Sequence, residues 1–118
     1  MYGLPPDFDA SVFVGHELLE VCFSANTIQL VFDENVSVTL EGAFAFAKVP
    51  SEELHRDRVP VESSALMVVA GEKVGHASSE PNGSLTLSFA GGATLVCLDD
   101  SPNFESYHVR IGDREIIV

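Results

Sequence analysis

The sequence has few basic residues for its size. Six Lys and Arg side chains stand against eighteen Asp and Glu, which gives a formal net charge of −12 at pH 7. Nucleic acids and anionic membranes bind proteins largely through Lys and Arg, so a surface this acidic repels both. We therefore expect no nucleic-acid partner and no membrane partner. The charge favours solubility and fast encounter with a basic protein.

The chain also lacks the features of a secreted, membrane-spanning or disulfide-stabilised protein. No apolar run approaches the roughly 20 residues that a spanning helix needs. The segment Met1–Asp7 has no basic residue followed by an apolar core, so we expect no signal peptide. Cys22 and Cys97 are the only cysteines. These observations predict a cytoplasmic protein in which both cysteines are free thiols without a redox role.

What the sequence does contain is a repeated alternation of apolar and polar residues. Within Gly83–Leu98, apolar residues occupy every second position on both sides of the dipeptide Gly91-Gly92. This pattern predicts a β-hairpin with one buried face. The same alternation occurs in Thr27–Phe32 and again from Val36 to Phe46, where Gly42 interrupts it and suggests a bulge or bend.

Short helices are expected before each set of strands. Asp9–Val14 and Ser63–Ala70 are both followed by a glycine that can take the left-handed conformation, Gly15 and Gly71. The sequence thus predicts two pseudo-symmetric repeats, each of one helix and three strands, at about residues 9–46 and 63–98. The polar stretch between them is expected to be a surface connection, with a turn of helix at Ser51–His55.

The last part of the chain predicts one further hairpin. Two β-prone segments flank Gly112-Asp113, a signal for a type II′ turn, which gives a hairpin at about residues 106–118. We therefore predict a single domain over residues 1–118 with a β-rich α+β fold. Its two helix-plus-three-strand repeats would form either a sandwich of two sheets or a partly closed barrel.

Motifs for catalysis are absent from the sequence. It contains no Gly-x-Ser-x-Gly, no phosphate-binding loop and no Cys-x-x-Cys. His16, Glu17 and Glu20 could perform acid–base chemistry if they lined a cleft, but charges that protect a strand edge explain them equally well. We therefore expect no enzyme activity.

Two segments have side chains of the kind that bind metal ions. Glu52-x-x-His55 has the spacing of a helical metal pair, but a di-iron site needs two such pairs on long helices. Asp99–Glu105 holds five oxygen-bearing side chains of the type that calcium prefers, without the spacing of an EF-hand. A solvated connection and a turn-rich loop account for these segments, so we expect no metal and no cofactor.

Three segments carry a wider pattern: Gly15–Phe32, Gly71–Leu98 and the tail Asp99–Tyr107. The pattern is Leu-Gly-x-x-Val before an alternating Leu-x-Leu-x-Phe strand, then a Gly turn and an acidic, Pro-containing tail with Glu and an aromatic residue. In this pattern the chain resembles a group of small bacterial domains of unknown function, although Ala70 stands where the group has Leu. The resemblance implies a β-rich domain, and some members are associated with toxin–immunity systems.

Two functions of different class follow from these observations. The first is a non-catalytic binding protein, in its most specific form an immunity-type inhibitor that masks a basic partner. The second is a small-ligand-binding protein or enzyme with a pocket between the two repeats. For the first, the candidate acidic surface consists of Asp99, Asp100, Glu105, Glu52 and Glu53.

The sequence also predicts self-association. The outer face of the strand that ends at Leu98 is apolar, and the terminal segment Glu115–Val118 has no Pro or Lys to blunt its edge. Both features favour a two-fold symmetric homodimer, and a monomer whose last strand pairs internally is the alternative. The candidate dimer contacts are Thr94, Val96, Leu98 and Ile117.

Overall fold

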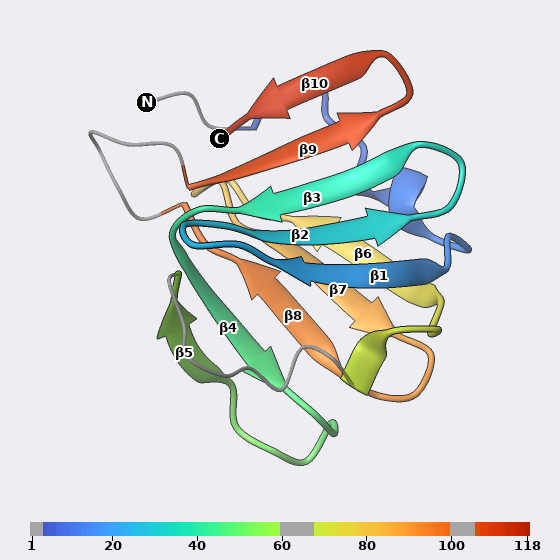
Figure 1. The fold of residues 1–118 in the computed structure, drawn as a ribbon, viewed down its shortest axis with the longest axis vertical. Helices are drawn as coiled ribbons and strands as arrows, with labels where there is room; N and C mark the ends of the chain where they lie inside the picture. The colour runs from blue at the N-terminus through green and yellow to red at the C-terminus, as the bar shows by residue number, and fades with distance from the viewer. Residues whose placement is uncertain (1–3, 60–67, 100–105) are drawn as a thin grey trace.

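Two five-stranded antiparallel sheets pack against each other in the computed structural model, which describes residues 4–59, 68–99 and 106–118 (Figure 1). Sheet one has the strand order β1-β2-β3-β9-β10, and sheet two has the order β5-β4-β8-β7-β6. The strands of sheet one are β1 (Leu18–Phe23), β2 (Ile28–Phe32), β3 (Val36–Leu40), β9 (Tyr107–Ile111) and β10 (Arg114–Ile117). Those of sheet two are β4 (Ala43–Ala47), β5 (His55–Arg58), β6 (Val74–Ser79), β7 (Leu85–Phe89) and β8 (Thr94–Cys97).

The core lies between the two sheets and is built from the alternating apolar positions. Successive side chains of a strand point to opposite faces, so every second residue enters the core. Leu30, Val38, Leu87 and Leu95 are completely buried there. At one end of the core, Phe13 packs edge-to-face against Phe32, with ring centroids 6.0 Å apart. Phe13 belongs to the one short helical element with described bounds, the 3-10 turn η1 (Ala10–Phe13).

The chain passes from sheet one to sheet two at Gly42. Val36–Phe46 was expected to form one strand, but the structure divides it into β3 and β4, which lie in different sheets. The N–H groups of Glu41 and Gly42 both donate to the Ser106 carbonyl, at 3.0 Å each. These two hydrogen bonds hold the end of β3 beside the residue that leads into β9.

A second junction joins β1 to β6 through the main chain of residues 15–18 and 71–74. Glu17 and Lys73 form an isolated antiparallel bridge. Around it, N–H groups donate to carbonyls in four bonds: Gly15 to Val74, Val74 to His16, Leu18 to Glu72, and Gly71 to Leu18. Gly15 and Gly71 have φ angles of 88° and 89°, which L-residues with side chains rarely adopt. The two glycines therefore permit the turns that bring the sheets together.

The predicted helix-plus-three-strand repeats are wrong, and with them the α+β class. The described residues contain no α-helix, because Asp9–Val14 forms only a 3-10 turn, capped by Asp9 and followed by Gly15. Val12 and Val14 are β-branched, which disfavours a longer helix. The expected helix Ser63–Ala70 falls mostly on residues 60–67, which lie outside the described residues. The fold is nearly all β, with two antiparallel sheets.

Strand β5 was not predicted from the sequence. The expected turn of helix at Ser51–His55 is wrong, and His55–Arg58 instead pairs antiparallel with β4. All four residues of β5 are exposed, so they show no alternation of apolar and polar residues. The strand exists because β4 offers it unpaired main-chain groups. Such pairing leaves no local signal in the sequence.

The cysteines lie where the strand alternation placed them. Both are free thiols: Cys97 is completely buried in the core and Cys22 is half-buried. Burial raises the pKa of the Cys97 thiol to about 12. The C-terminal hairpin is β9–β10, and Gly112 has the positive φ that its turn requires.

The fully buried Tyr107 ties sheet one to the turn before β7. Its hydroxyl donates a hydrogen bond of 2.5 Å to the carbonyl of Gly83. Gly83 cannot carry a side chain here, because a Cβ would lie 2.3 Å from the Asp99 carboxylate and φ is 92°. Burial raises the pKa of Tyr107 well above its usual range, and the nearby Cys97 and Asp99 add to this shift.

We predict that Tyr107→Phe lowers the free energy of unfolding by about 1–3 kcal/mol, because it leaves a buried carbonyl without its partner. The control is Ser106→Ala, one residue earlier. The Ser106 hydroxyl is buried and has no hydrogen-bond partner within the described structure, so its removal should cost much less. Urea denaturation of the three proteins measures both effects. Equal losses in the two variants would contradict the proposed role of the Tyr107 hydrogen bond.

Candidate functional site

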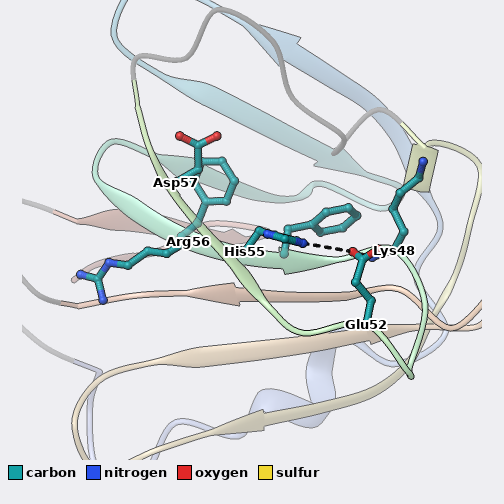
Figure 2. Close-up of a pocket in the computed structure, with 7 residues that line it drawn as sticks. Lys48, Glu52, His55, Arg56 and Asp57 are labelled. Carbon is teal, nitrogen blue, oxygen red and sulfur yellow. Dashed lines mark hydrogen bonds and ion pairs between the residues drawn. The ribbon is translucent and has the colours of Figure 1, made fainter.

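The first candidate site is a cleft of about 300 Å³ beside the β4–β5 hairpin (Figure 2). It lies within sheet two, whereas the pocket expected from the sequence was to lie between the two repeats. The residues that line it are Phe44, Phe46, Lys48, Glu52, His55, Arg56 and Asp57. The cleft therefore combines two aromatic side chains with charged groups of both signs.

The register of the hairpin explains this composition. Phe46 lies opposite His55, and Phe44 lies opposite Asp57, so these four side chains share one face of sheet two. That is the face from which the two phenylalanines enter the core. Because β5 is the edge strand, its side chains extend past the core into solvent.

The polar groups of the cleft are only loosely organised. The Glu52 carboxylate accepts a hydrogen bond of 3.1 Å from the Lys48 main-chain N–H. This hydrogen bond holds the carboxylate at the mouth of the cleft. Glu52 Oε1 is 4.0 Å from His55 Nε2, beyond hydrogen-bond distance, and the His55 side chain is 77% exposed. Arg56 extends away from Lys48 and Glu52 in Figure 2. This arrangement suits contact with a ligand better than proton transfer.

The second candidate site is the acidic end, which we define as Glu17, Asp33, Glu34, Glu72 and Asp113. These residues lie at or beside the turns on the right of Figure 1, where β1 and β6 begin and where β2–β3 and β9–β10 turn. Main-chain hydrogen bonds connect these segments, from Asp33 N–H to the Glu17 carbonyl and from Gly112 N–H to the Asn35 carbonyl. Lys73 and Arg114 are the cations beside them. Four separate parts of the chain thus place five carboxylates along one end of the sandwich.

The six Lys and Arg residues divide evenly between the two sides of the molecule, and Lys73, Arg110 and Arg114 lie at or near the acidic end. Lys48, Arg56 and Arg58 are three of the six Lys and Arg residues, and all three lie on the β4–β5 hairpin and the residue after β4. Figure 1 shows this hairpin at the lower left, away from the acidic end. Lys73 and Arg114 offset part of the charge of the five carboxylates, so the acidic end keeps an excess of negative charge.

Asp33 fixes the geometry of the acidic end. One carboxylate oxygen lies 2.6 Å from His16 Nδ1, and the other accepts the Glu17 main-chain N–H at 3.3 Å. The hydrogen bond to His16 lowers the pKa of Asp33. The β2–β3 turn that follows holds Glu34 and Asn35 at φ angles of 55° and 61°, a conformation typical of type I′ turns. Asp33 therefore ties this turn to the junction of the two sheets.

The acidic end was missed because its residues are far apart in the sequence. Each of them stands in or next to a predicted turn, or just before a predicted strand. In an antiparallel meander, alternate turns lie at the same end of the sheet. The positions of the turns could therefore have indicated which acidic residues lie at one end. Combining the turn positions with the strand order would have grouped these carboxylates.

The described members of the acidic surface that the sequence suggested, Asp99, Glu52 and Glu53, lie at two different ends of sheet two. Asp99 is half-buried and lies beside Gly83 at one end of β8. Glu52 and Glu53 lie in the loop beyond the opposite end of the paired strand β4. Asp100 and Glu105 lie outside the described residues, so the contribution of this tail to a partner surface stays a prediction.

The predicted dimer contacts lie on two different sheets. Thr94, Val96 and Leu98 follow β8 on the outer face of sheet two, and all three are half-buried. Ile117 is also half-buried, but it belongs to β10, at the edge of sheet one. The last strand pairs internally with β9, as the monomer alternative assumed.

Within residues 4–59, 68–99 and 106–118, no three His, Cys, Asp or Glu side chains are grouped so that they could hold a metal ion. In the same part of the chain, no helix has the length and apolar character needed to cross a membrane. Most of the calcium-type segment Asp99–Glu105 lies outside these ranges.

Comparison with known proteins gives one match. Residues 11–118 match a family described as a family of unknown function (DUF6188). No curated protein and no solved structure matches the chain. The family match confirms the coarser part of the resemblance seen in the sequence, a domain family of unknown function.

We predict that the Asp33–His16 contact makes stability depend on pH. Because the pKa of folded Asp33 lies below its unfolded value, its contribution is present above about pH 4 and is lost as the pH falls further. Asp33→Asn should therefore lower the urea midpoint at pH 7, and the difference from the parent protein should shrink below about pH 4. A difference that does not change with pH would show that the carboxylate charge is not responsible.

Proposed function

The chain belongs to the DUF6188 family of unknown function, and we propose that it is a non-catalytic binding protein that uses its acidic end to bind a basic protein. The observation that carries this proposal is the grouping of Glu17, Asp33, Glu34, Glu72 and Asp113 at one end of the sandwich. Complementary charge speeds the encounter of two proteins and helps to select the partner. The net charge of −12 adds to this attraction.

The support for a rigid docking surface comes from the main chain beneath the carboxylates. Glu17 is bridged to Lys73, and Glu72 accepts a hydrogen bond of 2.7 Å from the Gly91 N–H. Asp33 is fixed by His16 and by the Glu17 main chain. Glu34 and Asp113 are exposed at the tips of their turns. Charges held in this way lose little conformational freedom on binding.

The most specific form of the proposal is an immunity-type inhibitor. A toxin that acts on nucleic acid needs a basic surface to bind phosphates, and an acidic protein can cover that surface. Two observations support this form, the resemblance of the sequence to domains associated with toxin–immunity systems and the excess of negative charge at the acidic end. The inhibitor would act by occupying the surface and would need no catalytic group of its own.

The double variant Glu34→Gln/Asp113→Asn tests this proposal, since both side chains are exposed and neither anchors a turn. The immobilised parent protein should capture a basic protein from an extract of the producing organism, and high salt should release it. The double variant should weaken the affinity for that purified protein by about two- to tenfold.

The matched control is Glu53→Gln/Glu80→Gln, which removes the same charge from exposed positions outside the acidic end. It should bind the captured protein nearly as well as the parent. Equal weakening by both double variants would mean that only net charge matters. Capture of no basic protein would contradict the proposed partner class.

We propose a small-molecule ligand for the β4–β5 cleft as a second candidate function. The observation that favours it is the position of Lys48, His55 and two carboxylates around Phe44 and Phe46. Charges of both signs beside aromatic rings suit a small zwitterion with an apolar side chain. A volume of about 300 Å³ is at the low end of known ligand pockets.

L-Phenylalanine, a zwitterion of this kind, is a suitable probe. We expect L-phenylalanine to shift the NMR resonances of His55 and Phe46 at lower concentration than phenylacetate or phenethylamine does. Phenylacetate has only the carboxylate of phenylalanine, and phenethylamine has only its ammonium group. Lys48→Met should weaken the effect, whereas Arg110→Met, on the other sheet, should not. Equal responses to all three compounds would show that the charged groups of the cleft do not select a ligand.

A further inference from the structure

Among the described strands, β1 is the sheet edge that combines exposed apolar side chains with main-chain groups that no described strand pairs. It lies at the end of sheet one, and beyond Leu18 no strand in the described part of the chain pairs with its outer side. Leu19 is 52% exposed and Phe23 is 43% exposed. No Lys, Arg or Pro lies within β1 to discourage pairing, and Glu20 is its only charged residue. The pairing of β1 with β2 is irregular at Leu19 and regular from Glu20 to Phe23, so the irregularity lies at one end of the edge.

The direction of the main-chain groups along β1 follows from its pairing with β2. In the hairpin turn, the Ser24 N–H donates to the Thr27 carbonyl at 2.9 Å. Hydrogen-bonded pairs alternate along an antiparallel ladder, so Cys22 and Glu20 also direct their N–H and C=O groups toward β2. Val21 and Phe23 therefore direct theirs outward, to the free edge.

We propose that two copies of this chain associate through β1, with the two strands antiparallel about a two-fold axis at Val21. In this register Val21 lies opposite the partner's Val21, and Leu19 lies opposite the partner's Phe23. Glu20 lies opposite the partner's Cys22, so no two like charges face each other. The exposed apolar residues at the two ends of the segment thus pair with each other, which makes the edge self-complementary.

The other edges of the sheets are less suited to self-pairing. Strand β5 has His55, Arg56, Asp57 and Arg58 exposed along its whole length. Strand β10 begins with the exposed charges of Arg114 and Glu115. Strand β6 packs against η1. Charged side chains on an edge are a common protection against pairing, and β1 lacks them apart from Glu20.

Net charge opposes this association and gives it a recognisable signature. Each copy has a charge of −12, and repulsion between copies weakens as salt screens it over a Debye length of about 8 Å at physiological ionic strength. Added salt should therefore strengthen the dimer. Added salt should weaken the binding of a basic partner at the acidic end, so the effect of salt distinguishes the two interactions.

The first test is light scattering over a range of protein concentrations at low and high salt. The fraction of the parent protein that is dimeric should increase with protein concentration and with salt concentration. Leu19→Lys/Phe23→Lys should raise the dissociation constant by more than about tenfold, since it places charges at both ends of the paired segment. The control Val14→Lys/Val49→Lys changes side chains that are each 45% exposed elsewhere, and it should dimerise like the parent.

Circular dichroism and thermal unfolding establish that these variants are folded. A parent protein that is monomeric under every condition would overturn the proposal. So would a dimer that survives Leu19→Lys/Phe23→Lys but is lost in Val96→Glu, because that result would assign the contact to the outer face of sheet two.

The second test is a disulfide cross-link that depends on the register. In the proposed pairing Glu20→Cys faces the partner's native Cys22, so mild oxidation should give a covalent dimer on a non-reducing gel. Adding Cys22→Ser to this variant should abolish the cross-link. His76→Cys, at the β6 edge, should form none beyond collision background. Cross-linking that is unaffected by Cys22→Ser would contradict the register.

Discussion

The fold depends on the exchange of main-chain hydrogen bonds between residues 15–18 and 71–74. Two sheets that cross each other leave edge strands whose N–H and C=O groups need partners. Here the first residues of β1 and β6 serve as partners for each other, so the two sheets are held together by backbone as well as by apolar packing. Gly15 and Gly71 are required because both turns need a positive φ.

This junction also determines where the acidic surface lies. Glu17 and Glu72 are part of the bonded segments, and Asp33 is attached to Glu17 by hydrogen bonds in both directions. The carboxylates are therefore placed by the same contacts that join the sheets. The main chain beneath Glu17, Asp33 and Glu72 is thus fixed by the junction. The cleft beside β5 lies instead at a sheet edge, where β5 pairs with β4 along one side.

The sequence predicted most strands, because their alternation of apolar and polar residues reflects burial on one face. β2 lies within the expected segment Thr27–Phe32, and β7 and β8 form the hairpin expected within Gly83–Leu98. The errors came where structure is decided by distant contacts. His55–Arg58 is a strand only because β4 needs a partner, and the run from Val36 changes sheets because Gly42 meets Ser106.

The burial of Cys97 has a practical consequence. A thiol with a pKa of about 12 and no access to solvent cannot react with an alkylating reagent while sheet two is closed. Its rate of modification therefore reports how often the core opens, in the same way that amide exchange reports local unfolding. Cys22, half-buried on the other sheet, provides an internal reference for reagent reactivity. The chain thus contains a native chemical reporter of its own opening rate.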